Sequence, residues 1–233
     1  MFRAAATLGI ATTLMLFASA ARAQRDNPFS GRGADSSAES RRPAASIDER
    51  LKAMDSVVYR LAPSSRLTVK TGKAGLLGFA GHSHVIQART FDGKVVYYPK
   101  APSSSHLEIT VLTDSLQVLT PPDTEEIRKV TATMRSDVLR TAQYHEIRLV
   151  SRQITATREG FHVVGAVTIV GQTREVPIDV GVQLGLDTLV ADASFSVKQT
   201  DFGIKPYSGG PGGTVKVADR VAFDIHAIAR RSD

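Results

Sequence analysis

From Val57 to about Ala229, short runs of residues alternate between apolar and polar, and this period of two restricts the fold more than any other feature. Successive side chains of a β-strand point to opposite faces, so alternation gives each strand one buried and one solvated face. A helix would instead need apolar residues every three or four positions. The region is therefore predicted to be all-β. The clearest runs are Leu67/Val69, Leu107/Ile109/Val111, Ile147/Leu149, Val176/Ile178/Val180/Val182/Leu184, Ala193/Phe195/Val197 and Val221/Phe223/Ile225/Ala227/Ala229.

Turn-forming residues separate these runs, at Asp92-Gly93, Glu159-Gly160, Gly171-Gln172 and residues 99–102. Many strands joined by short turns pair antiparallel, and a long meander with one apolar face forms a barrel or a sandwich. Because a barrel leaves no strand edge unpaired, we predict an antiparallel barrel. Residues 57–231 have a suitable length for one such domain.

One segment has the period of a helix. Ile127, Val130 and Met134 fall on one helix face that continues to Val138, and Asp123 forms a capping pair with Glu126 at the start. A second helical turn is expected around residues 74–79. Both helices should cover an opening or a flank of the barrel.

The first 23 residues have the layout of an export signal. Arg3 gives the positive start, residues 8–17 form a short apolar run, and Ala21-Arg22-Ala23 resembles a cleavage site. The apolar run is about half the roughly 20 residues that a spanning helix needs, and no comparable run follows. We therefore expect a periplasmic or secreted protein with no integral membrane segment after cleavage.

Residues 24–56 are expected to be a disordered tether between this signal peptide and the barrel. Ser, Ala, Gly, Arg and Asp dominate residues 24–46, which contain Phe29 as their only large apolar side chain. The spacing of apolar residues in 47–56 allows a short helix at the end of the tether.

Composition narrows the classes of function. The chain has no cysteine, which excludes disulfides, thiol catalysis and a lipid-modified N-terminal thiol. Removal of residues 1–23 leaves 27 basic against 23 acidic residues. Such a small excess of positive charge, in a chain with no tryptophan and 6% aromatic residues, argues against nucleic-acid binding.

Three segments carry a resemblance to a known family. They are Gly165-Ala-Val-Thr-Ile-Val-Gly-Gln-Thr-Arg-Glu-Val-Pro-Ile-Asp179, Met134-Arg-Ser-Asp-Val-Leu-Arg-Thr-Ala-Gln-Tyr144 and Asp201-Phe-Gly-Ile204. They resemble motifs of the YceI-like family of exported lipocalin-like proteins, and the resemblance covers about residues 57–231. It implies an eight-stranded antiparallel barrel whose elongated apolar cavity holds a polyisoprenoid or similar lipid. The sequence does not decide whether the protein forms a homodimer.

His82 and His84 point the same way if their segment is extended, and two such imidazoles can bind Zn or Cu. His106, His145 or a carboxylate could complete the ligand set, but no spacing dictates a third ligand. The alternatives are that the two histidines cap an apolar turn or contact the head group of a ligand. An envelope metal-binding or stress-response protein is therefore the second hypothesis, and no metal or cofactor is assigned.

Catalytic motifs are weak. Residues 209–214 lack the Gly-Lys-Ser/Thr ending of a phosphate loop and are interpreted as a hairpin loop. No Gly-x-Ser-x-Gly elbow occurs, and Glu125-Glu126 fits the first turn of a helix. An enzyme is not expected, and a small-molecule hydrolase is the third hypothesis.

The leading hypothesis is a non-enzymatic binding protein that sequesters or carries an apolar lipid chain inside the barrel. Many inward positions are Val or Ala, which leaves more room than a core of large aromatic residues. The choice of face depends on register, since a shift of one residue would reverse it. The expected lining is Leu67, Val69, Ile109, Val111, Ile147, Leu149, Val167, Ile169, Phe195 and Phe223, with Leu76, Leu77, Phe79, His82 and His84 near the entrance.

Overall fold

The protein was analysed as a computed structural model that describes residues 55–74, 83–119, 124–209 and 215–232. The signal peptide and nearly all of the tether fall in residues 1–54, outside the described residues. The second helical turn after Ala74, the capping residue Asp123 and most of the glycine-rich loop are outside them too.

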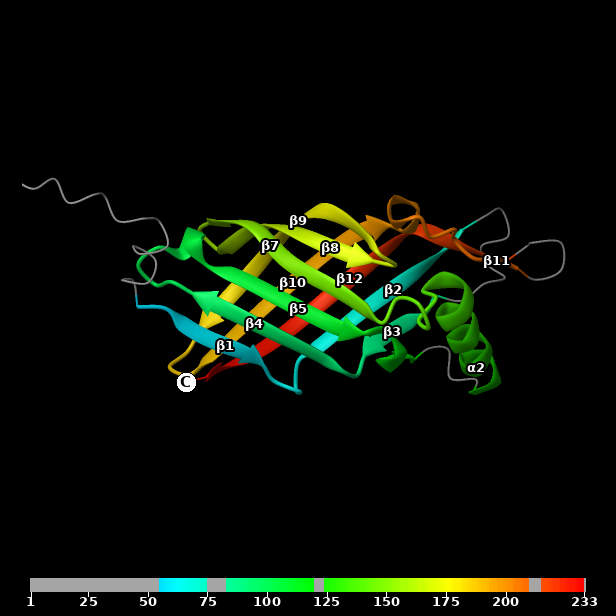
Figure 1. Ribbon diagram of the computed structural model, residues 1–233, viewed down its shortest axis with the longest axis horizontal. Coiled ribbons are helices and arrows are strands. Elements are labelled where there is room, and N and C mark those ends of the chain that lie inside the picture. The colour runs from blue at the N-terminus through cyan, green and yellow to red at the C-terminus, as the bar shows by residue number, and fades with distance from the viewer. Residues whose placement is uncertain (1–54, 75–82, 120–123, 210–214, 233) are drawn as a thin grey trace, which may run out of the picture. The chain divides into compact units, whose positions relative to one another are not determined.

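Most described residues belong to the strands of one antiparallel sheet (Figure 1). Its strands are β1 (Val57–Leu61), β2 (Arg66–Ala74), β3 (Val85–Ala88), β4 (Phe91–Tyr97), β5 (His106–Leu112), β6 (Leu116–Val118), β7 (Glu146–Ala156), β8 (Gly160–Ile169), β9 (Gln172–Leu184), β10 (Thr188–Lys198), β11 (Ser208–Gly209) and β12 (Val215–Ser232).

The sheet closes into a barrel, as the alternation predicted, and the barrel has the eight strands that the family resemblance implied. The ring has eight strand positions, which we call courses. Each of the first three courses consists of two strands in line: β1 with β2, β4 with β3, and β5 with β6. The strands β7, β8, β9, β10 and β12 complete the ring. The ring closes because β12 pairs with β10 on one side and with both β1 and β2 on the other. All of these pairings are antiparallel.

A crease crosses the first three courses where their segments meet. At the break between β1 and β2, the Ser65 hydroxyl donates to the Ile228 carbonyl oxygen and accepts from the Ile228 N–H, both at 3.0 Å. At the break between β5 and β6, the Thr113 hydroxyl donates to the Tyr144 carbonyl oxygen at 2.8 Å. These buried side chains bond to backbone groups beside the breaks in the strands, and at the first break the Ala62 N–H also donates to the Ile228 carbonyl oxygen, at 2.7 Å.

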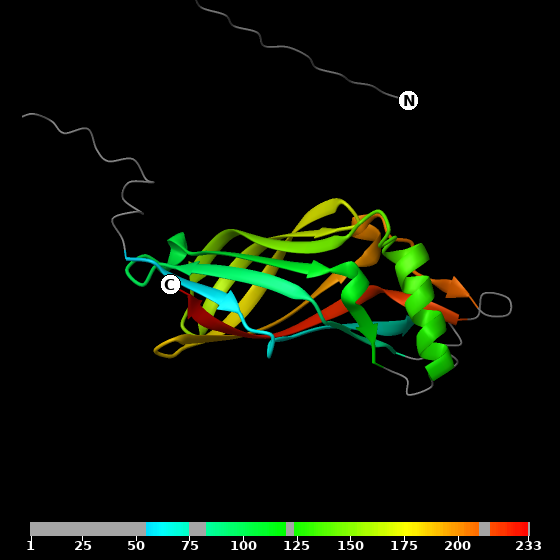
Figure 2. The same ribbon diagram turned by 60° about the horizontal axis from the view of Figure 1, so that its bottom comes forward.

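Beyond the crease, β6 pairs with β3 and leaves the neighbourhood of β7, so the barrel is open along this side. The helix α2 (Thr124–Thr133) stands across that end, as Figure 2 shows, and continues into a π turn at Met134–Val138. The helix predicted from apolar spacing is therefore confirmed, and it covers an opening as expected. Within the described part of the chain, we find no helix with the length and apolarity needed to cross a membrane.

One predicted turn is wrong. Asp92-Gly93 lies inside β4, opposite β1 and β5. A Cβ built on Gly93 would lie 2.8 Å from Cδ1 of Leu61, so glycine leaves the space that the Leu61 side chain occupies. The dipeptide there allows close packing of a side chain over the strand rather than a reversal of the chain.

Candidate functional site

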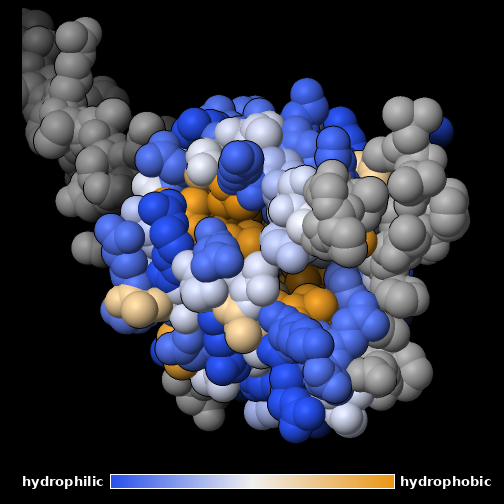
Figure 3. Space-filling view, turned by 90° about the vertical axis from the view of Figure 1, so that its right-hand side faces the viewer, coloured by the Kyte–Doolittle hydropathy of each residue, from blue (hydrophilic) through white to orange (hydrophobic). Residues whose placement is uncertain are grey.

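An apolar cavity of about 500 Å³ lies inside the end of the barrel that α2 covers. We call it the outer cavity. Figure 3, a view of this end, shows apolar side chains in a hollow between hydrophilic surface residues. The wall consists of inward-facing residues of the strands, and the cover is the inner face of α2 and the π turn. The main apolar lining residues are Val69, Ile86, Leu116, Val130, Met134, Val138, Leu139, Ile147, Ile169, Val197, Phe202, Ile204, Val217, Val221 and Phe223.

A second space of about 70 Å³, which we call the inner void, lies further from α2. Six strands, β2, β3, β7, β8, β10 and β12, reach it two residues beyond their last contribution to the outer cavity, whereas β5 lines only the inner void. Val197 of β10 lines the outer cavity and Phe195 the inner void, and Ile169 and Val167 of β8 have the same relation. The two spaces share the side chains Val69, Ile86, Leu116, Ile147 and Phe223.

The stacked rings of Phe195 and Phe223 stand at this boundary. The two residues are direct cross-strand partners in β10 and β12, with ring centroids 4.8 Å apart and an interplanar angle of 1°. Phe223 lines both spaces, whereas Phe195 lines only the inner void.

The opposite end of the barrel is filled by its own side chains. Tyr59, Leu189 and Ala229 form a buried cluster there, and Tyr97 packs edge-to-face on Phe161 with ring centroids 6.5 Å apart. We call this region the packed end. The interior of the barrel is therefore hollow at the α2 end and solid at the packed end.

All ten lining residues expected on the strands point into the barrel. Ile169 faces the outer cavity, and Val69, Ile147 and Phe223 face both spaces. The other six face the inner void: Leu67, Ile109, Val111, Leu149, Val167 and Phe195. Whether these residues contact a ligand stays a prediction.

The entrance residues have a mixed outcome. His84 lines the outer cavity and is 9% exposed, and its backbone N–H donates to the Thr71 hydroxyl at 3.1 Å. The remaining four, Leu76, Leu77, Phe79 and His82, lie outside the described residues.

Part of the lining was not identified from the sequence. A 3-10 turn at Gln199–Phe202 follows β10 and forms one side of the outer cavity, to which Gln199, Phe202 and Ile204 contribute. These residues have no regular periodicity, so alternation does not single them out. The feature of the sequence that marks this segment is the family motif at Asp201–Ile204.

The 3-10 turn is held to β12 by polar contacts. The side-chain amide of Gln199 donates to the Ala218 carbonyl oxygen at 2.9 Å. The backbone N–H and the hydroxyl of Thr200 donate to the two carboxylate oxygens of Asp219, at 2.9 and 2.8 Å. These two hydrogen bonds lower the pKa of Asp219 because they stabilise its charged form.

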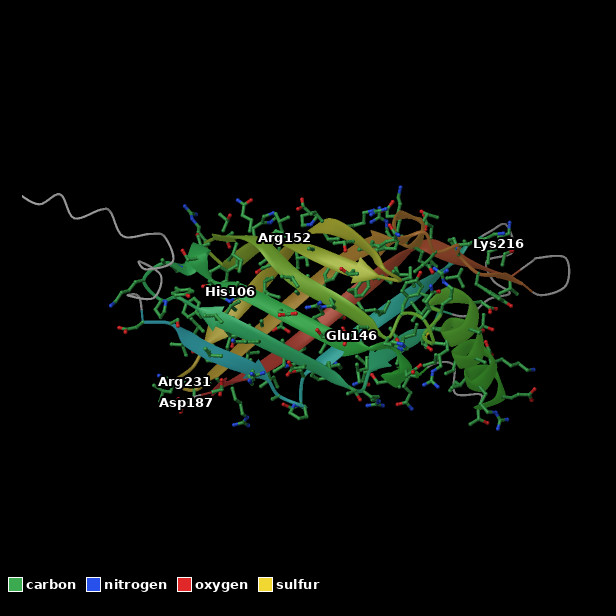
Figure 4. All side chains as sticks on the ribbon, in the orientation of Figure 1. His106, Glu146, Arg152, Asp187, Lys216 and Arg231 are labelled. Carbon is green, nitrogen blue, oxygen red and sulfur yellow. The ribbon has the colours of Figure 1, made fainter. Side chains whose placement is uncertain are left out.

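Charged groups are confined to the rim of the outer cavity. Lys129 and Glu126 reach it from α2, and Lys216, which Figure 4 labels at this end of the barrel, reaches it from β12. The Lys129 ammonium lies 2.7 Å from Glu125 Oε1, and this hydrogen bond and the positive charge lower the pKa of Glu125. A ligand at this site would meet polar groups at the mouth and apolar groups further in.

The described residues include no candidate metal site, since no group of three or more His, Asp or Glu side chains gathers among them to hold an ion. His106 pairs with Val96 toward the packed end, far along the sheet from His84, and Figure 4 shows it away from α2. The hydrogen-bonded pairs His162–Asp179 and His226–Asp192, both at 2.7 Å, are exposed.

The three motif segments that suggested a family meet around the outer cavity. Ile169 comes from the segment Gly165–Asp179, Met134 from Met134–Tyr144 and Phe202 from Asp201–Ile204, and all three line the cavity. Tyr144 also lies against the turn of the segment Gly165–Asp179, since a Cβ built on Gly171 would lie 2.8 Å from the Tyr144 Cε1.

Comparison with known proteins agrees with this arrangement. The fold is similar to that of BcnA from Burkholderia cenocepacia, at 18% sequence identity and a TM-score of 0.56, over 72% of this chain and 98% of BcnA. It is also similar to a polyisoprenoid binding domain from Saccharophagus degradans, at 11% identity and a TM-score of 0.55, over 75% of this chain and 98% of that domain. The search of curated proteins gives no significant match. The model of the YceI-like domain matches residues 59–229, so the chain belongs to the YceI-like family.

Proposed function

We propose that this protein binds a single apolar chain of the isoprenoid type in the outer cavity and thereby sequesters or carries it in water. The observation that supports the proposal is the outer cavity itself: about 500 Å³, lined mainly by aliphatic side chains and with charged groups only at its rim. Cavities that hold small molecules have volumes of about 300–1,000 Å³. The relative from Saccharophagus degradans is described as a polyisoprenoid binding domain, which favours the same class of ligand here.

The energetics of burial support binding without any charged anchor. Each methylene removed from water contributes about 0.8 kcal/mol. About ten such groups contribute about 8 kcal/mol, which exceeds the lower estimates of the cost of association, ~4 kcal/mol. A binder rather than a catalyst is the role that fits, because the inner part of the cavity offers contact area and exclusion of water.

The proposed site of action is the cell envelope, as a periplasmic or secreted protein. Residues 1–23 have the layout of an export signal. Outside the cytoplasm, water separates the membranes between which a lipid would have to move. A barrel that shields an apolar chain would lower that barrier.

The proposal can be tested by filling the outer cavity. Val130 lies on the cavity face of α2, whereas Ala132, two residues away, is exposed and does not line the cavity. Val130→Trp should abolish binding of farnesol to the purified protein, since the indole occupies the space of the chain. Ala132→Trp places the same side chain on the outer face of the helix and should leave binding unchanged.

The measurement is titration with farnesol, together with native mass spectrometry and lipid extraction of the protein as purified. We expect a bound apolar molecule in the unmodified protein and in Ala132→Trp. Absence of any bound lipid and of farnesol binding in the unmodified protein would refute the proposed function.

A further inference from the structure

We infer that the stacked pair Phe195–Phe223 is the stop against which the end of the ligand chain rests, and that it sets the preferred ligand length at about 15 carbons. The inference rests on the proposed function, because it assigns the length of the chain that the same cavity accepts. It predicts a short prenyl group rather than a long polyprenyl chain.

The position of the pair supports its role as a stop. Phe223 borders both the outer cavity and the inner void, and Phe195, its stacked cross-strand partner, borders only the inner void. The rings are parallel within 1° and their centroids are 4.8 Å apart, so together they form one flat aromatic obstacle. A chain that enters from the α2 end meets Phe223 after it has filled the outer cavity.

No second exit exists among the described residues along the same line. Beyond the inner void, the packed end is closed by Tyr59, Leu189 and Ala229, of which Ala229 is 0% exposed. A chain longer than the outer cavity must therefore displace the aromatic pair or leave its surplus length in water at the mouth.

The volumes set the length. One small non-hydrogen group fills roughly 30 Å³ of liquid, as water does, so the outer cavity of about 500 Å³ holds about 17 such groups. The inner void of about 70 Å³ adds room for about two. Farnesol, with 15 carbons, fits within the outer cavity, and geranylgeraniol, with 20, exceeds it.

A series of prenyl alcohols gives a direct readout of this limit. From geraniol to farnesol, each added isoprene unit should strengthen binding by at least ~tenfold, because its carbons leave water. From farnesol to geranylgeraniol and beyond, the gain should fall below ~threefold, because the stop leaves the surplus carbons in water at the mouth, where they add little to binding. The break in the series marks the position of the stop.

Phe195→Ala should move the break by one isoprene unit. Phe195 is half-buried, and truncation of its side chain opens a space on the order of 100 Å³, comparable to engineered core cavities. Together with the inner void, this space accommodates about five more carbons. Geranylgeraniol should then bind the variant at least ~tenfold more tightly than farnesol. Phe195→Leu, which retains more packing, should give a smaller shift in the same direction and serves if Phe195→Ala does not fold.

Phe161→Ala is the matched control. Phe161 packs on Tyr97 at the packed end and lines neither space, so its truncation should reduce stability without moving the break. Affinity that rises steadily to long polyprenols in the unmodified protein, or an unmoved break in both Phe195 variants, would overturn the stop while leaving the proposed function intact. Failure of every alcohol to bind the unmodified protein would instead reject the proposed function.

Discussion

At the scale of single residues, the turn between β8 and β9 shows how the motif of this family shapes the mouth of the barrel. Val170 and Gly171 both have positive φ, at 43° and 74°, as a tight two-residue hairpin requires. A β-branched residue is rare in this conformation, yet Val170 is 3% exposed and packs in the main core. Burial of its side chain compensates for its unfavourable backbone.

Gly171→Ala is expected to destabilise the protein more than Gly203→Ala. Both glycines have positive φ, at 74° and 71°, so each substitution costs about 1 kcal/mol in backbone strain. The new Cβ at Gly171 would also press on the Tyr144 ring, which adds about 1–3 kcal/mol, whereas nothing lies within 4 Å of the corresponding position at Gly203. Urea unfolding of the two variants measures the difference, and equal losses would contradict the contact with Tyr144.

The face of the sheet to which each side chain points could be predicted from the sequence, because side chains in a strand alternate strictly between the two faces. The inward orientation of Leu67, Val69 and Phe195 follows from that rule alone. The rule does not say which inward side chains leave space between them. That depends on the neighbouring strands: Leu61 fills the space above Gly93, and Leu149 would meet a Cβ on Gly165 at 2.6 Å.

At the scale of elements, the 3-10 turn Gln199–Phe202 carries one side of the outer cavity and is attached to β12 through Asp219. The sequence showed α2 because four apolar residues at helical spacing make a periodic signal. It did not show this turn, since four residues without a period cannot be distinguished from a loop. The π turn after α2 was missed for a related reason: Met134 and Val138 continue the apolar face, so the pattern reads as an unbroken helix.

Asp219→Asn is expected to destabilise the protein at neutral pH and to have no effect in strong acid. The pKa of Asp219 is lowered in the folded state by the two hydrogen bonds from Thr200, so its charged form stabilises the fold at pH values above its ordinary pKa. This contribution is lost as the pH falls through the lowered pKa of the folded state. Urea unfolding of the variant and of the unmodified protein across this pH range measures the difference in their free energies of unfolding.

Asp187→Asn is the control for this titration, because Asp187 is an exposed carboxylate at the packed end, as Figure 4 shows, and is distant from the 3-10 turn. Removal of its charge should change the free energy of unfolding only slightly, and this change should not show the pH dependence expected for Asp219→Asn. A loss in Asp219→Asn that persisted unchanged in strong acid would mean that the charge of Asp219 has no part in holding the turn.

At the scale of the whole barrel, the contrast between the hollow half and the packed end separates binding from stability. Apolar alternation predicted both halves equally, because it distinguishes apolar from polar side chains and takes no account of their size. The packed end is solid because Tyr59, Tyr97 and Phe161 supply bulk there, whereas aliphatic residues and the crease leave space under α2. The hollow thus arises from the distribution of large side chains between courses that are distant in the sequence.

Ile178→Ala should reduce stability more than ligand binding, and Ile147→Ala should reduce ligand binding more than stability. Ile178 is 3% exposed and lines neither space, so its truncation leaves a new cavity and should cost about 2–4 kcal/mol without weakening farnesol binding. Ile147 already borders both spaces and is only half-buried, so its truncation should cost about 1 kcal/mol but weaken binding. Unfolding and titration of both variants measure the contrast; equal effects on binding would contradict the division of the interior.

The place of β12 has a consequence for how the chain reaches this state. β12 holds both β10 and the first course of the barrel, so residues 215–232 must be present before either neighbour is fully paired. As the polypeptide emerges from the ribosome, the edge of β1 and β2 that pairs with β12 stays unpaired for most of the synthesis, and the corresponding edge of β10 stays unpaired until β12 follows. Such long-range closure is slow and leaves the nascent chain open to association with its neighbours. Assembly is therefore a single late event, and a chaperone that shields those two edges until residue 232 has emerged would accelerate productive folding.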